Sequence, residues 1–147
     1  MAAVFTIGYQ ESTPDAVIGT LAAAGVRLLV DVRAVAASRR PGFSKRQLAA
    51  GVTAVGIDYL HLRDLGTPPD GRHAARAGRH DEMRRIFEAH LATPAAAAEF
   101  DELADLVVAG RLLCLLCFER HADHCHRRIL GERLTERLGV EVIDLVP

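Results

Sequence analysis

The chain has 147 residues, of which 50% are hydrophobic and 25% are charged. These values fit one globular domain over residues 1–147 and exclude a largely disordered chain. The 18 lysines and arginines nearly balance the 19 aspartates and glutamates, for a formal net charge of -1. No overall positive field therefore attracts nucleic acid or an anionic membrane, and any anion site must be local.

The cysteine count and the apolar runs predict the compartment. The chain has 3 cysteines and starts without the charged segment and apolar run of a secretory signal. No apolar run reaches the roughly 20 residues that a membrane-spanning helix needs. We expect a cytoplasmic protein with no membrane partner and no cofactor.

The first elements form a β-α-β unit. The β-branched and aromatic run at residues 4–8 predicts a strand. Thr13 then caps a helix that has Pro14 in its first position, and Gly25 ends that helix in a left-handed conformation. The continuous apolar run at residues 28–32 is typical of a parallel strand covered by helices on both faces.

The middle of the chain repeats this pattern. Residues 44–47, Ser-Lys-Arg-Gln, have the sequence of a capping box at the start of a second helix, and residues 57–62 predict the third strand. Residues 66–72 are rich in glycine and proline and predict a loop. The next segment, residues 72–80, has no defined pattern, and residues 81–91 are compatible with a helix.

The last third completes the alternation of strands and helices. A helix is expected over residues 93–110, a central strand over 111–118, a loop over 119–123, a helix over about 124–138 and a strand over 141–145. The predicted fold class is α/β, a three-layer α/β/α sandwich with a mainly parallel five-stranded sheet.

Polar residues follow the predicted strands. In an open parallel sheet, ligands bind beyond the carboxyl ends of the strands, where the strand order reverses. The residues at these ends that we expect to bind a substrate or hold such a residue in place are Gly8, Tyr9, Asp31 and Arg33.

A basic segment follows the second strand. Arg33 and Arg39 are suited to bind carboxylate or phosphate in a bidentate fork, and Ser38 can donate a hydrogen bond. Asp31 is placed to orient Arg33 by a short ion pair. The alternative is that Ser38 to Arg46 forms a solvated basic loop.

The segment from Cys117 to Arg128 carries the densest chemistry. Cys125 is expected in the first turn of a helix beside histidines and arginines, an environment that lowers the pKa of a thiol. Cys125 or Cys117 is then a candidate nucleophile, and Glu119 or His126 a candidate proton carrier.

Two other interpretations of this segment stay open. Its cysteines and histidines are zinc-competent, but Cys114 and Cys117 point to opposite faces of one strand and form a poor zinc knuckle, so we assign no metal ligand. The cluster can also brace the loop between strand and helix. Cys114 is expected to be a small buried apolar residue.

Four separated motifs resemble one known family. They are Thr6-Ile7-Gly8-Tyr9, Val30-Asp31-Val32-Arg33 with Ser38-Arg39, Leu65-Gly66-Thr67-Pro68, and Cys117-Phe118-Glu119-Arg120 with Cys125-His126-Arg127. Together they resemble the domain of unknown function 488 family. The resemblance implies a compact α/β domain of bacterial and archaeal type and no established reaction. Residues 68–72 depart from the charged continuation expected after the third motif.

Two functional hypotheses follow. The first is an enzyme that acts on a small anionic or phosphate-bearing, nucleotide-like substrate, with Arg33, Arg39 and Arg127 as anion clamps. The second is a module without catalysis that binds nucleic acid or a protein through the loop Ser38 to Arg46. The small number of aromatic residues, five Phe, two Tyr and no Trp, provides few stacking surfaces for single-stranded nucleic acid.

Overall fold

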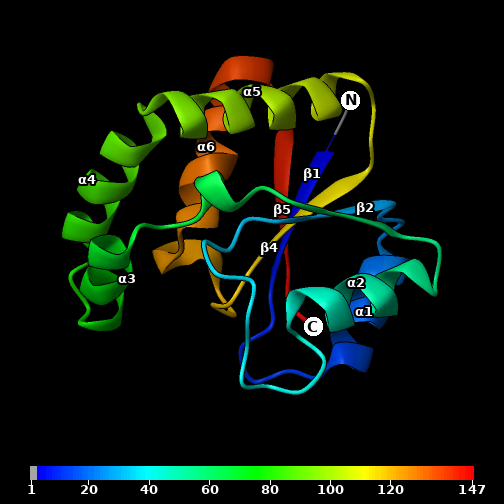
Figure 1. Ribbon diagram of the computed structural model, residues 1–147. Helices are drawn as coiled ribbons and strands as arrows, with labels where there is room; N and C mark the ends of the chain where they lie inside the picture. Colours follow the sequence, from blue (N-terminus) through cyan, green and yellow to red (C-terminus); the bar gives the residue numbers. More distant parts are fainter. Residues whose placement is uncertain (1–2) are drawn as a thin grey trace.

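The computed structural model describes residues 3–147, which form one parallel sheet between two layers of helices (Figure 1). The strands are β1 Ala3–Gly8, β2 Leu28–Asp31, β3 Asp58–His61, β4 Leu113–Cys117 and β5 Glu141–Leu145. Their order across the sheet is β3-β2-β4-β1-β5, and every pairing is parallel. The predicted fold class is confirmed.

The helices lie on the two faces of the sheet. The elements α1 Pro14–Ala23 and α2 Lys45–Thr53 cover one face, at the lower right of Figure 1. The opposite layer contains α3 Pro69–Arg76, α4 His80–Leu91, α5 Pro94–Val108 and α6 His126–Leu138. Two 3-10 turns, η1 Arg63–Leu65 and η2 Ala122–His124, follow β3 and β4.

Each face of the sheet has its own hydrophobic core. Leu29 and Cys114 pack with the residues of α1 and α2, whereas Leu28, Leu115 and Cys117 pack with those of α3 to α6. The period of two along a strand therefore separates Cys114 from Cys117, as predicted. Cys114 is fully buried in the first of these cores.

The strand order brings the motifs together. From β1 the chain runs by way of α1 to β2 and then to β3, whereas from β3 it returns to β4 and crosses β1 to reach β5. The helices after β1 and β4 therefore cover opposite faces, and the neighbouring carboxyl ends of β1 and β4 form the switch point at which ligands bind in such sheets.

Most helix ends follow the sequence. The Thr13 hydroxyl accepts a hydrogen bond from the Ala16 backbone N–H at 3.2 Å, and Pro14 is the first helical residue. Gly25, after α1, has a φ of 78°, and Gly110, after α5, has a φ of 83°. These positive values explain why glycine ends both helices.

The capping box predicted at Ser44 does not form. The Ser44 hydroxyl donates to the carbonyl of Ser38 and accepts from its N–H, while the Gln47 side chain accepts from the N–H of Gly42. The side chains of Ser44 and Gln47 thus stabilise the preceding loop. They are then not available to cap the backbone N–H groups of the helix.

The loop predicted over residues 66–72 was partly wrong, because α3 begins at Pro69. Proline suits the first turn of a helix, where its missing N–H has no helical partner. Gly71 lies inside this helix. Glycine suits the position because a Cβ there would be 2.5 Å from Cγ2 of Thr67. Pro69 and Gly71 are typical of loops in a sequence, yet in this structure they allow a closely packed helix.

Within residues 3–147, no helix combines the length and the apolar character required to cross a lipid bilayer.

Candidate functional site

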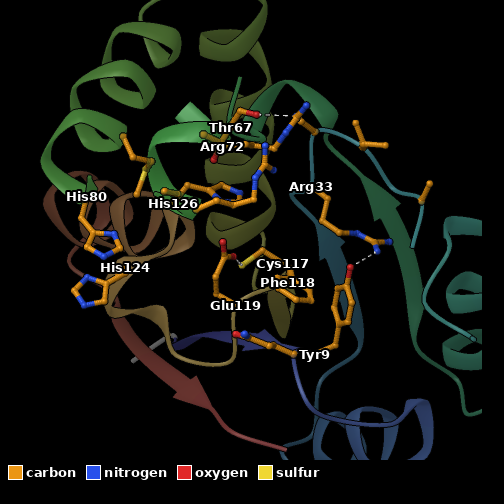
Figure 2. Close-up of a pocket in the computed structure, with 17 residues that line it drawn as sticks. Tyr9, Arg33, Thr67, Arg72, His80, Cys117, Phe118, Glu119, His124 and His126 are labelled. Atoms are coloured by element: carbon orange, nitrogen blue, oxygen red, sulfur yellow. Dashed lines mark hydrogen bonds between the residues drawn. The ribbon is translucent and has the colours of Figure 1, made fainter. Parts of the chain in front are cut away.

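A cavity of about 490 Å³ lies at the carboxyl ends of β1, β2 and β4 (Figure 2). The segments after these strands form its floor and one side, with Tyr9, Arg33, Cys117 and Glu119 among the lining residues. Helix α3 and the start of α4 form another wall. In Figure 2, Glu119 and His126 lie between the stacked pair His80–His124 on one side and Tyr9 with Arg33 on the other.

Most hydrogen-bond donors of the Arg33 guanidinium are used by other groups of the protein. Its Nε and Nη2 donate to the two oxygens of Asp31 at 2.9 and 2.7 Å, and its Nη1 donates to the Tyr9 hydroxyl and the Phe43 carbonyl at 3.1 and 2.7 Å. An arginine has five N–H groups, so these four bonds leave one for a ligand. The predicted ion pair is confirmed, and it is buried, with exposures of 6% for Arg33 and 0% for Asp31.

The surroundings of Arg33 keep it charged. Burial opposes the charge of Arg33, but the hydrogen bonds and negative charge of Asp31 outweigh burial and raise the pKa of the guanidinium. Asp31 also accepts a hydrogen bond from the Tyr59 hydroxyl at 2.5 Å. Burial and this hydrogen bond raise the pKa of Tyr59, so its hydroxyl remains a donor at neutral pH.

Arg127 is buried in the same manner, at 0% exposure. Its Nη1 donates to the Cys117 sulfur at 2.9 Å and to the Glu119 carbonyl at 2.5 Å, and its Nη2 donates to the Arg120 carbonyl at 3.2 Å. Its Nε donates to the Thr6 hydroxyl at 3.1 Å. Arg127 therefore fixes the loop after β4 to strand β1 and is absent from the lining of the cavity.

Gly8 has a steric role in this arrangement. A Cβ at this position would lie 1.6 Å from the Glu119 carbonyl oxygen and 2.9 Å from Nη1 of Arg127. Only glycine lets the loop after β4 pass this close to β1. Gly66 acts likewise, because a Cβ there would lie 2.1 Å from the backbone nitrogen of Ala34.

A carboxylate and two thiols form one cluster at the floor of the site, and of these residues Glu119 and Cys117 line the cavity. The thiols of Cys117 and Cys125 both donate to Oε2 of Glu119 at 3.3 Å. Both cysteines are buried, with exposures of 1% and 3%, whereas Glu119 is half-buried and lines the cavity. The carboxylate of Glu119 thus contacts both buried thiols and also lines the cavity.

His126 completes this cluster. Its Nε2 lies 2.8 Å from the Val32 carbonyl oxygen, and its Nδ1 lies 3.7 Å from the Cys125 sulfur. Because a carbonyl only accepts, Nε2 carries a proton and donates it to Val32, and Nδ1 is the ring nitrogen that faces Cys125.

The charge state of the cluster at neutral pH follows from these contacts. Burial and hydrogen bonding with Cys125 raise the pKa of Cys117 well above its ordinary value. Burial opposes ionisation of Glu119, but the charge of His126 and hydrogen bonds from the backbone and both thiols outweigh it and lower the pKa of Glu119. In the ligand-free cluster, Glu119 is ionised and Cys117 is a neutral thiol.

The position of Cys125 differs from the prediction. It is the residue before α6, with extended backbone angles, rather than part of the first helical turn. Cys125 packs in the hydrophobic core, its thiol donates to Glu119, and the residue does not line the cavity. The 3-10 turn η2 directly before it includes His124, the residue at which the helix was predicted to begin.

The structure brings some of the predicted residues into the cavity and leaves others outside it. Five predicted residues line it: Tyr9, Arg33, Cys117, Glu119 and His126. Six do not: Gly8, Asp31, Ser38, Arg39, Cys125 and Arg127. Ser38 accepts from the N–H of Arg40, and Arg39 points to solvent.

Two arginines of α3 were missed by sequence reasoning. Arg72 and Arg76 line the cavity, and Arg72 donates one hydrogen bond, to the Thr67 carbonyl at 3.1 Å. Among the ion pairs of residues 3–147, none includes Arg72 or Arg76. Their spacing of four residues, which places both on one helix face, was the available signal.

Comparison with known proteins gives a family for the chain. The family model described as "Domain of unknown function DUF488" matches residues 13–134. The chain belongs to this family. No curated protein and no solved structure matches it. In this DUF488 chain, Gly8 and Gly66 allow close packing of the backbone, and Glu119 and His126 both line the cavity.

Proposed function

We propose that this DUF488 protein is an enzyme that acts on a small anionic substrate, with a phosphate-bearing molecule as the best candidate. The observation that supports this most is the charge distribution of the cavity. Arg72 and Arg76 supply positive charge without an acidic partner, while Glu119 is the single carboxylate in the lining. An anion bound by the arginines would lie opposite a group that can accept and return a proton.

The roles of the site residues follow from their contacts. Arg72 and Arg76 bind the anionic group, Glu119 carries protons, and Tyr9 and Phe118 provide an aromatic wall, with ring centroids 5.4 Å apart. Arg33 and Arg127 position the strand ends instead of clamping the anion, because four N–H groups of each are used within the protein. Attack by Cys117 or Cys125 on the substrate stays a prediction.

The test combines binding and turnover. Inorganic phosphate and pyrophosphate are titrated by calorimetry, and phosphomonoesters, nucleotides and small carboxylates are screened for turnover. We expect the double variant Arg72→Met/Arg76→Met to lose at least about tenfold in phosphate affinity, equivalent to 1.4 kcal/mol. Glu119→Gln is expected to bind phosphate and to lose turnover, with Glu88→Gln on the outer face of α4 as the matched control.

Two results would overturn the proposal. One is phosphate and pyrophosphate binding that the double variant leaves unchanged, or no binding at all. The other is turnover that Glu119→Gln leaves intact. The alternative of a nucleic-acid-binding loop at Ser38 to Arg46 predicts instead a steep salt dependence of DNA or RNA binding that charge reversal at Arg39 and Arg40 abolishes.

A further inference from the structure

The floor of the cavity brings together ligand types that bind zinc. Sγ of Cys117, Sγ of Cys125 and one ring nitrogen of His126 all lie within 4.8 Å of one another, and all three residues are buried. They come from two separate parts of the chain, the end of β4 and the start of α6. The sequence showed zinc-competent residues in this segment but not which of them meet, because that depends on how the loop between these elements folds back.

The separation of His126 from Cys125 suits one tetrahedral ion. With zinc–sulfur bonds of about 2.3 Å and zinc–nitrogen bonds of about 2.0–2.1 Å, two such ligands lie about 3.5 Å apart. Nδ1 of His126 and Sγ of Cys125 are 3.7 Å apart. This pair is therefore close to the separation of two ligands of one ion, whereas the widest separation among the three ligand atoms, up to 4.8 Å, would have to shorten by about 1 Å on binding.

The orientation of His126 is the second, independent observation. Its Nε2 donates to the carbonyl of Val32, so Nδ1, which faces the Cys125 sulfur, is the ring nitrogen left for a metal. Such a hydrogen bond from the distal nitrogen to a backbone carbonyl is the usual support of a histidine that ligates a metal. The buried ring is thus already oriented for ligation.

The charges around the sulfurs are also suited to a bound metal. Two thiolates and the carboxylate of Glu119 would carry three negative charges, which a divalent ion and the Arg127 guanidinium would neutralise. Nη1 of Arg127 already lies 2.9 Å from Sγ of Cys117. Hydrogen bonds from guanidinium to metal-bound thiolate are charge-assisted and stabilise the ligated form.

We propose that Cys117, Cys125 and His126 bind one divalent zinc-class ion. Within residues 3–147, no fourth Cys, His, Asp or Glu lies within the same distance of all three. Three protein ligands with an open fourth position are typical of catalytic zinc sites. The fourth position is then available to water or to the anionic substrate, a step that rests on the proposed function, whereas binding of the ion does not.

Binding of the metal ion replaces the protons of the two thiols. Each thiol loses one proton as its metal–sulfur bond forms, so one divalent ion releases two protons and no electron is transferred. Glu119 accepts a hydrogen bond from both thiols and lines the cavity, which gives these protons a route to solvent. Apparent metal affinity is expected to rise with pH.

The test is a titration of the chelator-treated full-length protein with cobalt(II) and then zinc. We expect one cobalt per chain, an absorption band of thiolate-to-cobalt charge transfer, visible bands of four-coordinate cobalt, and displacement by zinc. Cys117→Ser, Cys125→Ser and His126→Gln are each expected to lower affinity by more than about 100-fold, since loss of a ligand exceeds the typical effect of an outer hydrogen bond. Cys114→Ala is the matched cysteine control.

A second measurement covers variants that fail to fold. Native protein is alkylated with and without zinc, and each cysteine is analysed by mass spectrometry. Zinc should protect Cys117 and Cys125 and leave the labelling of Cys114 unchanged. Absence of saturable cobalt binding, a spectrum without the charge-transfer band, or labelling indifferent to zinc would overturn the proposal.

The two proposals fail separately. Arg72→Met/Arg76→Met should bind cobalt like the unmodified protein while phosphate affinity falls. Cobalt binding without any phosphate binding would overturn the proposed function and leave the metal site standing. Phosphate binding without cobalt binding would do the reverse.

Discussion

The two buried arginines and the two arginines of α3 differ in what their charges do. Arg33 and Arg127 each give four N–H groups to the protein and hold the ends of β1, β2 and β4 in place. Arg72 and Arg76 have no acidic partner in the described chain and face the cavity. A conspicuous arginine in a sequence motif is therefore not evidence of ligand contact; its free hydrogen-bonding capacity decides its role.

The largest effect should come from the buried pair. Arg33→Met removes the partner of Asp31, which is 0% exposed, and leaves a charge without compensation. Breaking such a pair typically costs about 3–5 kcal/mol. Urea unfolding should show this loss, while Arg39→Met, at an exposed position, stays within about 0.5 kcal/mol. A stable Arg33→Met protein that fails to bind phosphate would assign Arg33 to the ligand instead.

Gly8→Ala should have the next largest effect. The added methyl group collides with the Glu119 carbonyl, so the loop that Arg127 holds must shift. Overpacking of this kind typically costs about 1–3 kcal/mol, measurable by thermal and urea unfolding. Gly19→Ala is the matched control, because its methyl group meets no atom within 4 Å and an alanine favours helix α1. Equal behaviour of the two variants would disprove the close approach at Gly8.

Alkaline pH should destabilise the metal-free, reduced protein. Burial raises the pKa of Cys114, and burial together with hydrogen bonding to Cys125 raises that of Cys117, so both thiols stay protonated in the folded state after those of the unfolded chain ionise. Their contribution is fully present below the unfolded pKa of about 8.5 and is lost as pH rises toward the folded values.

The expected slope is roughly 1.4 kcal/mol of unfolding free energy per pH unit for each thiol. Cys114→Ala removes one of the two thiols and should reduce the slope by about half. Urea unfolding from about pH 8 to pH 10, with chelator and reductant present, measures it. A flat profile would contradict the assignment of two neutral buried thiols.

The smallest effect on stability should come from the arginines of the cavity. Arg76→Met changes an exposed residue without an ion pair, so its free energy of unfolding should stay within about 0.5 kcal/mol of the unmodified protein. The same variant should weaken phosphate binding and reduce its dependence on salt concentration. A large loss of stability would instead give Arg76 a structural role like that of Arg33.

The fold was predictable because its signals are local. Apolar runs of strand length alternate with helices that Thr13, Pro14 and Gly25 delimit, and these residues act within a few positions of themselves. The ion pair of Asp31 with Arg33 was predictable for the same reason. Strand order was not, because it depends on contacts between distant segments.

The site was only partly predictable. The cluster of Glu119, Cys125 and His126 could be recognised by its composition, but the direction of each side chain is set by tertiary contacts such as that of His126 with Val32. Helix α3 was missed because Pro69 and Gly71 usually mark loops, although here they serve a helix start and a close contact. The cationic wall of the cavity was missed with it.

The cavity has a floor and a wall of different origin. The floor is built from strand ends that are fixed by Gly8, Gly66 and the buried arginines. Helix α3 forms the wall, packs chiefly on α4, and lies between a 3-10 turn and a helix in the chain. Residues 67–80 form one continuous stretch of the wall. Exchange of this segment would alter charge and shape around a substrate while the floor keeps its geometry, which makes it the place to redirect substrate selectivity.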